Sequence, residues 1–223
     1  MRRIGALTMA AFVPALACGQ SFWFGVKAGV PITEYFQTGI VYFHPIGSYT
    51  NYSAATRRYT LGVSAEWRHS QALGFEADAL YKRMGYVAFD FAIRELAAVD
   101  VKGNSWEFPL LAKYRFRRRL HPYVAAGGVF RYIGPVRGRG QRFEMSPNNS
   151  KTATPIDTIH PAELDERSFA GTVGAGGIEL RAGRFRLLPE IRYTRWMTNL
   201  SNPYSSALSF KSNQVEVLVG FLF

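Results

Sequence analysis

One group of residues in this sequence has the types and spacing of a reaction site. Asp157, His160, Glu163 and Asp165 fall in one short stretch, where they could bind a metal ion or supply a general base for hydrolysis. Acidic loop residues are more commonly just solvated, and no predicted strand carries a Ser/His/Asp set. The single cysteine, Cys18, excludes disulfide frameworks and iron–sulfur clusters. We therefore predict no catalytic residue, no metal ligand and no cofactor, and a protein that is not an enzyme.

A second kind of charged residue occurs at every other position of otherwise apolar segments. This period of two is typical of a β-strand, because successive side chains point to opposite faces. Acidic and basic residues are balanced on the charged face, and a buried charge is tolerated only where it is paired and hydrogen-bonded. The residues that we expect to form a network of ion pairs are Lys27, Glu66, Arg68, Glu76, Asp78, Glu107, Lys113, Arg115, Arg131, Glu190, Arg192 and Glu216.

The alternation appears in eight segments joined by connections that alternate in length. The segments are 22–29, 59–68, 73–82, 106–116, 123–132, 169–181, 186–193 and 213–223. The long connections are about 31–57, 86–103, 134–166 and 197–212, and the short ones are 69–71, 117–120 and 182–183. This arrangement predicts an all-β, eight-stranded, antiparallel up-and-down barrel with both termini at the end of the short turns.

The apolar face carries Phe, Tyr or Trp on nearly every segment, and these side chains are too bulky for the interior of an eight-stranded barrel. Gly, Ala and ion pairs on the other face fit a narrow lumen. An apolar exterior suits lipid. In lipid the sheet must close, because no water is present to hydrogen-bond the backbone N–H and C=O groups of an open edge. We therefore predict a transmembrane barrel, with aromatic residues at two depths. Those toward the turns are Phe22, Trp67, Phe75, Phe116, Phe221 and Phe223, and those toward the long loops are Tyr59, Trp106, Phe130 and Tyr132.

Residues 1–17 have the anatomy of a cleaved secretory signal: two arginines, a short apolar run and a small-x-small ending. A boundary at 19 or 20 is the alternative, and we expect Cys18 not to be lipidated because the lipobox leucine is misplaced. The barrel domain is then 21–223. Loss of Arg2 and Arg3 lowers the formal charge from +11 to +9, because 25 basic residues then face 16 acidic ones. Such a charge would suit nucleic acid, but export puts that partner out of reach.

Four stretches match a known pattern. They are Glu107-Phe108-Pro109-Leu110-Leu111 with Lys113-Tyr114-Arg115-Phe116, Pro122-Tyr123-Val124-Ala125-Ala126-Gly127, Pro189-Glu190-Ile191-Arg192-Tyr193, and Val219-Gly220-Phe221-Leu222-Phe223. With these the mature chain resembles the bacterial outer-membrane β-barrel domain family, the small barrels akin to OmpX and the transmembrane domain of OmpA. The resemblance implies an outer-membrane location, contact with lipid and lipopolysaccharide, and a barrel-assembly machinery that reads Phe221 and Phe223.

The long connections supply the candidates for an interaction surface. Arg137, Arg139 and Arg142 open the third one, and arginine suits phosphate, so these residues are candidates for contact with lipopolysaccharide; a solvated loop is the alternative. Loop aromatics indicate either an extracellular patch for an unknown ligand or packing of the loops against one another. They are Tyr35, Phe36, Tyr42, Phe43, Tyr49, Tyr52 and Phe89.

A lumen filled by side chains is too narrow for large solutes. Our leading hypothesis is a non-enzymatic integral outer-membrane protein with a structural or surface-interaction role through its extracellular loops. The alternatives are a lipid-modifying or proteolytic enzyme that uses loop residues, a narrow channel, and a soluble lipocalin-like carrier.

Overall fold

The computed structural model describes residues 21–43, 47–55, 58–118, 120–145, 151–159, 167–197 and 208–223. The predicted signal segment and Cys18 lie outside these ranges. Within them the secondary structure consists of β-strands and turns. No helix in the described ranges is long and apolar enough to cross a membrane.

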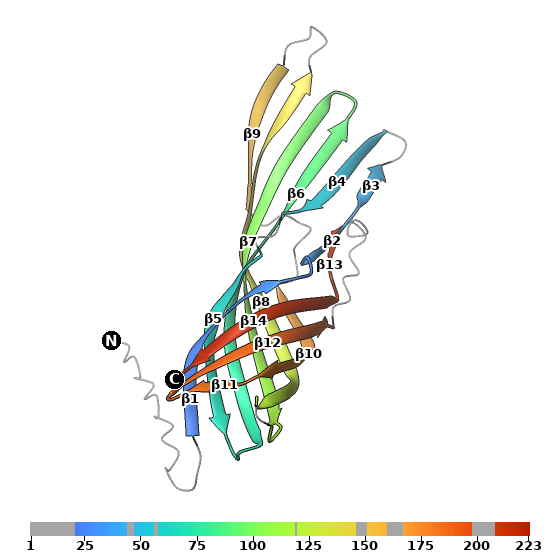
Figure 1. The fold of residues 1–223 in the computed structure, drawn as a ribbon. Coiled ribbons are helices and arrows are strands. Elements are labelled where there is room, and N and C mark those ends of the chain that lie inside the picture. Colours follow the sequence, from blue (N-terminus) through green and yellow to red (C-terminus); the bar gives the residue numbers. More distant parts are fainter. Residues whose placement is uncertain are drawn as a thin grey trace, which may run out of the picture.

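Eight strands close into an antiparallel ring (Figure 1). In ring order they are β1 (Ser21–Pro31), β5 (Thr60–Arg68), β6 (Leu73–Ala92), β7 (Glu95–Arg115), β8 (Pro122–Met145), β10 (Ser168–Ile178), β12 (Phe185–Trp196) and β14 (Asn213–Leu222). The first and last strands pair with each other, with Val26 opposite Phe221, so the ring has no free edge. This confirms the prediction of an all-β, eight-stranded up-and-down barrel.

The two faces of the ring have the polarity that the sequence predicts. Leu110 and Ile191 lie on the outer face with 66% and 61% of their surface exposed. Lys113 lies three residues after Leu110 in β7, and Arg192 lies next to Ile191 in β12. Both charged side chains are buried inside the ring. The apolar side chains therefore point out of the ring, and the charged ones point in.

Short turns join the strands at one end of the ring, which we call the turn side, and the opposite end is the loop side. The turn between β5 and β6 spans residues 69–72, and β12 follows the short strand β11 (Leu180–Ala182) after two residues. The tight return between β11 and β12 needs a left-handed residue, which Gly183 supplies with a φ of +61°. The predicted short connections are confirmed.

Aromatic side chains form two belts on the outer face of the ring. On the turn side, the ring of Trp67 lies 6.4 Å from that of Phe22 and 5.5 Å from that of Phe75. On the loop side, the ring of Trp106 lies 5.3 Å from that of Tyr81. The two belts bracket a band of aliphatic side chains.

Much of the predicted long loops is strand rather than irregular chain. β6, β7 and β8 have 20, 21 and 24 residues and continue past the ring into a tall open sheet, the extension (Figure 1). The extension is completed by β3 (Ile40–Phe43) and β4 (Ser48–Ala54) beside β6, and by β9 (Lys151–Ile159) beside β8. The prediction that residues 86–103 form a loop was wrong, because they form a hairpin that turns at residues 93–94.

A β-bulge separates the ring from the extension. In the pairing of β7 with β8, Ser105 lies opposite Ile133 whereas Gly103 lies opposite Val136, so β8 carries one extra residue there. Below the bulge the odd-numbered side chains of β8 point into the lumen. Above it they point to the outer face of the sheet.

A small sheet of β2 (Phe36–Thr38) and β13 (Leu208–Phe210) covers the loop side of the lumen. The ring of Phe210 lies 4.8 Å from that of Phe36 and 4.9 Å from that of Phe169. Tyr86 of β6 packs edge-on against Phe36 with 5.4 Å between the ring centres. An aromatic cap therefore closes this end of the barrel.

Candidate functional site

The upper layer of the lumen lies beneath the aromatic cap and contains Lys82, Glu107, Arg131, Gln214 and Glu216. Glu107 accepts hydrogen bonds from Lys82 Nζ at 2.6 Å and from Arg131 Nη2 at 2.6 Å. Lys82 also pairs with Glu216, and Arg131 Nη2 donates to Gln214 Oε1 at 2.5 Å. The two acidic and two basic side chains described in this layer balance each other.

Two aromatic residues cover the upper layer. The guanidinium carbon of Arg131 lies 3.9 Å from the ring centre of Trp196 and 5.3 Å from that of Tyr35, both cation–π contacts. Tyr35 follows β1 and lies outside the ring strands. Burial, together with the charges of Glu216 and Glu107, raises the pKa of the Tyr35 phenol well above its ordinary value of 10. Tyr35 is therefore a neutral lid over charged residues.

The middle layer contains Lys27, Glu76, Asp78, Glu190 and Arg192. Arg192 Nη2 lies 2.8 Å from Asp78 and 2.7 Å from Glu190. Lys27 Nζ lies 3.1 Å from Asp78 and 3.7 Å from Glu190, and it also pairs with Glu76. Every charge in this layer has at least two partners of opposite sign.

Lys113 joins the middle layer to the layer below. Its Nζ pairs with Glu76 and lies 3.2 Å from Glu66. The same ammonium group lies 4.5 Å from the ring centre of Tyr123, whose hydroxyl donates to Glu190 at 2.9 Å. With Lys113 included, three basic and three acidic side chains balance in the middle layer.

The lower layer, at the turn side, contains Glu66, Arg68, Arg115, Glu179 and Arg186. Glu179 lies between β10 and β11 and is shared by Arg68 Nη2 at 3.0 Å, Arg115 Nε at 2.8 Å and Arg186 Nη1 at 3.3 Å. Glu66 lies 3.1 Å from Arg68 and pairs with Arg115. Arginine therefore dominates this end of the lumen.

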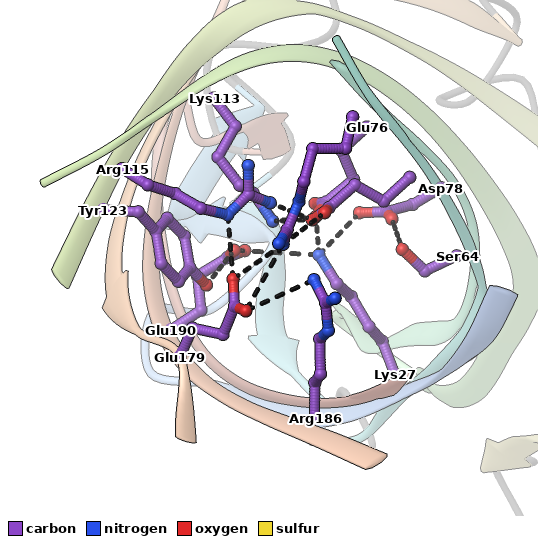
Figure 2. A network of polar contacts seen from close by, with 12 residues as sticks. Lys27, Ser64, Glu76, Asp78, Lys113, Arg115, Tyr123, Glu179, Arg186 and Glu190 are labelled. Carbon is purple, nitrogen blue, oxygen red and sulfur yellow. Dashed lines mark hydrogen bonds and ion pairs between the residues drawn. The ribbon is translucent and has the colours of Figure 1, made fainter. Parts of the chain in front are cut away.

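Side chains from strands around the ring converge on its axis (Figure 2). The side chains of Lys113 and Glu66 have no exposed surface, even toward the lumen. Buried ion pairs of this kind add little net stability, but removal of one partner leaves an uncompensated charge and costs about 3–5 kcal/mol. The network therefore acts as a plug whose members depend on one another.

All twelve residues proposed for the lumen network lie inside the ring and belong to these layers. The alternation of charged residues in the sequence does not predict which uncharged residues contact this network. Tyr123 and Gln214 share the inner face, Trp196 lies past the predicted end of its segment, and Tyr35 lies in a predicted loop without any signal.

The terminal residues lie at the seam of the ring. The amide of Phe223 donates to the carbonyl of Phe24 at 2.9 Å, and the amide of Phe24 donates to the carbonyl of Phe223 at 3.3 Å. The ring of Phe221 stacks on Phe185 with 5.3 Å between centres. Recognition of Phe221 and Phe223 by an assembly machinery stays a prediction.

A basic depression, the outer cleft, lies on the outer face of the extension. Its charged lining consists of Arg83, Asp100, Lys102, Arg137 and Arg139, and its volume is about 610 Å³. Lys102 lies opposite Arg137 in the sheet and pairs with Asp100. In the described part of the chain, the three arginines form no ion pair. Their charges are therefore available to a ligand.

Arg142 does not join the other two arginines of its predicted group. It lies opposite Ala97 and lines a different depression with Asp90 and Thr50, on the other face of the sheet. Arg137 and Arg139 share the outer face because they are separated by two positions, whereas Arg142 is an odd number of positions away. The three arginines therefore do not form one surface, and their contact with lipopolysaccharide stays a prediction.

The loop aromatics divide between the cap and the extension. Tyr35, Phe36 and Tyr52 are buried, so they cannot belong to an exposed patch. Tyr42 and Phe43 are exposed. Tyr49 and Phe89, the two remaining aromatics of the predicted set, are partly buried. Tyr49 stacks on Phe91, and Phe89 is half-buried. Packing between segments thus explains the first group.

The predicted reaction cluster falls mostly outside the described residues. His160, Glu163 and Asp165 lie there, and Asp157 is an exposed residue of β9. Within the described ranges, no group of three or more His, Cys, Asp or Glu side chains is placed to hold a metal ion.

The chain is similar in fold to several solved barrels, although no family model and no curated protein matches its sequence. Neisserial surface protein A (NspA) is 12% identical, with 92% of this chain and 97% of that chain covered and a TM-score of 0.40. The outer membrane protein OprG from Pseudomonas aeruginosa is 12% identical, with 92% and 96% covered and a TM-score of 0.44. Ail of Yersinia pestis is 12% identical, with 90% and 98% covered and a TM-score of 0.33. Likeness at this level says nothing of what the chain binds.

Proposed function

We propose that this chain is an integral outer-membrane β-barrel protein. The observation that carries the proposal is the polarity of the ring, apolar and exposed outside, ionic and buried inside. In water, so large an apolar surface is a liability for aggregation. In lipid it is favourable, and the closed ring leaves no edge of the sheet unpaired.

The dimensions of the ring support the same proposal. β14 has 10 residues and β1 has 11, and a tilted strand of about 9–11 residues crosses a hydrocarbon layer. The two aromatic belts match the two interfaces of a bilayer. The predicted export signal supports an orientation with the short turns in the periplasm and the extension outside the cell.

Gel migration of the detergent-extracted chain tests this proposal. Folded membrane barrels resist cold SDS, so we expect the unheated sample to migrate differently from a boiled one. The control is the same sample unfolded in urea before loading, which should migrate like the boiled chain. Recovery of the mature chain from the periplasm without detergent would instead establish the soluble carrier.

We also propose that the protein acts without catalysis, through surface interactions of its extension, and that the outer cleft binds the phosphate groups of lipopolysaccharide. The cleft begins at Asn104, two residues along β7 from Trp106 in the loop-side belt. A lipid headgroup of the outer leaflet would lie at this height, within about 7 Å of the belt. The guanidinium groups of Arg83, Arg137 and Arg139 suit phosphate oxygens because each presents a planar fork of donors.

The sheet itself supplies a matched control for this contact. We expect the double variant Arg137→Gln, Arg139→Gln to bind lipopolysaccharide about a hundredfold more weakly, since two charge-assisted contacts are lost. Arg142→Gln removes the same charge from the same strand on the opposite face, and it should bind like the unaltered protein. Binding is measured with purified barrel in mixed micelles. Equal weakening by both variants would show that net charge rather than the cleft is responsible.

A further inference from the structure

A second pocket opens at the turn side of the barrel, at the opposite end from the outer cleft. This turn-side pocket has a volume of about 540 Å³. Its lining comes from the lower layer of the lumen and from the turns around it, and consists of Arg68, Ser70, Gln71, Arg115, Phe116, Arg117, His121 and Arg181. No residue of the outer cleft takes part, so the two basic sites are separate.

Positive charge is in excess around this pocket. The Glu179 carboxylate is contacted by four guanidinium groups, those of Arg68, Arg115, Arg181 and Arg186. Among the described residues, Glu66 is the other carboxylate of this layer, which leaves two more positive than negative charges. The upper and middle layers are balanced, so the imbalance is a property of this end. Arg117, exposed on the rim, adds to it.

Buried donors in the same place lack acceptors. The side chain of Arg115 is 2% exposed; its Nη2 pairs with Glu66, whereas its Nη1 has no hydrogen-bond partner in the described part of the chain. Arg68 Nε is likewise without an acceptor. Both residues line the pocket, and a buried charged donor without an acceptor is costly. An anion in the pocket would satisfy these groups.

We infer that the turn-side pocket binds a phosphate group, held by Arg68 and Arg115 from the lumen and by Arg117 and Arg181 from the rim. Phosphate fits better than a carboxylate because its oxygens can accept from several guanidinium forks at once. The excess of positive charge compensates for a doubly charged ligand. Free phosphate and the headgroup of a lipid in the adjacent leaflet share this chemistry.

Calorimetric titration of the folded mature chain in a non-ionic detergent tests the inference. Inorganic phosphate and dihexanoyl phosphatidylglycerol, a short-chain lipid, are the two probes. We expect saturable binding of at least one, weakened about tenfold by Arg117→Gln or Arg181→Gln, since each removes one charged contact. Arg118→Gln is the matched control, because Arg118 is an exposed residue of the same turn that does not line the pocket.

The outcomes separate the two sources and the two proposals. Binding of inorganic phosphate assigns the site to a free anion, whereas binding of the short-chain lipid alone assigns it to a headgroup. No saturable binding of either probe, or equal weakening by Arg118→Gln, would overturn the inference. Each sample is first checked for heat-dependent gel migration, so a failure of the barrel proposal is seen independently of a failure to bind phosphate.

Discussion

Glu216 and Val217 are neighbours in β14 whose side chains meet opposite surroundings. Glu216 is 2% exposed and pairs with Lys82 inside the ring, whereas Val217 points outward and is 40% exposed. The pleat of a strand alone produces this contrast. A charge at position 217 would therefore face the exterior, where the ring offers no partner.

The variant Val217→Arg tests what lies outside the ring. If position 217 faces the middle of a bilayer, the free energy of unfolding should fall by about 2–4 kcal/mol. Met197→Arg, just past the loop-side end of β12, should cost no more than about 1 kcal/mol because it lies near the interface. Reversible urea unfolding in phospholipid vesicles measures both. Equal costs at the two positions would argue against a membrane around the ring.

β14 and β1 form the closing pair of the ring, so the first and last strands of the barrel need each other for their hydrogen bonds. The backbone of Phe223 exchanges two hydrogen bonds with that of Phe24 just beyond the last residue of β14. Closure therefore requires the end of the chain to be in place.

Deletion of Phe223 should lower the amount of barrel assembled in cells by several-fold while leaving refolding into detergent nearly unchanged. This follows if an assembly machinery reads Phe223, as the sequence predicts, because such a machinery would act on the unfolded chain. Heat-dependent migration of membrane extracts and of refolded protein gives the two yields. Phe75→Ala, which removes another turn-side aromatic, should leave both unchanged. A parallel loss in cells and in detergent would mean that Phe223 only stabilises the seam.

β8 shows why alternation alone cannot place every side chain. Its bulge moves the odd-numbered residues from the inner to the outer face of the sheet, and a period-two pattern contains no sign of where such a shift falls. Gly134 and Pro135 lie at the shift, and Gly or Pro within a strand often marks a bulge. With the bulge located, Arg137 and Arg139 are assigned outward and Arg142 to the opposite face.

The strands of the extension were not predicted from the sequence for a related reason. Residues 95–104 read Glu-Leu-Ala-Ala-Val-Asp-Val-Lys-Gly-Asn, in which apolar residues follow one another without a clear period. Both faces of the open sheet are partly exposed here, so neither selects strictly apolar side chains. The pairing of β6 with β7 continues nonetheless, because each strand prolongs a ladder that the ring has already started.

In the molecule as a whole, the sequence predicts those features that depend on whether a strand face is apolar or charged. Closure, strand number, turn placement and the inward position of residues such as Lys27 and Glu76 follow from alternation and polarity. Which acid meets which base does not follow, because partners such as Arg115 and Glu179 are 64 residues apart and meet only through the register of several strands. The small sheet of β2 and β13 is equally long-range, and neither segment has a pattern of its own.

Because β6, β7 and β8 run without a break from the ring into the extension, the ring determines the direction in which the extension points. β6 runs from the turn side to Ala92, ten residues past Lys82, a rise of about 30 Å. No joint interrupts the hydrogen-bonded ladder of β6 with β7 along this path. The extension is thus a direct continuation of the ring rather than a separate segment joined by a flexible linker. If the ring lies in a bilayer, as we propose, the membrane also fixes the direction in which the extension points, and a binding partner would meet a surface of defined orientation.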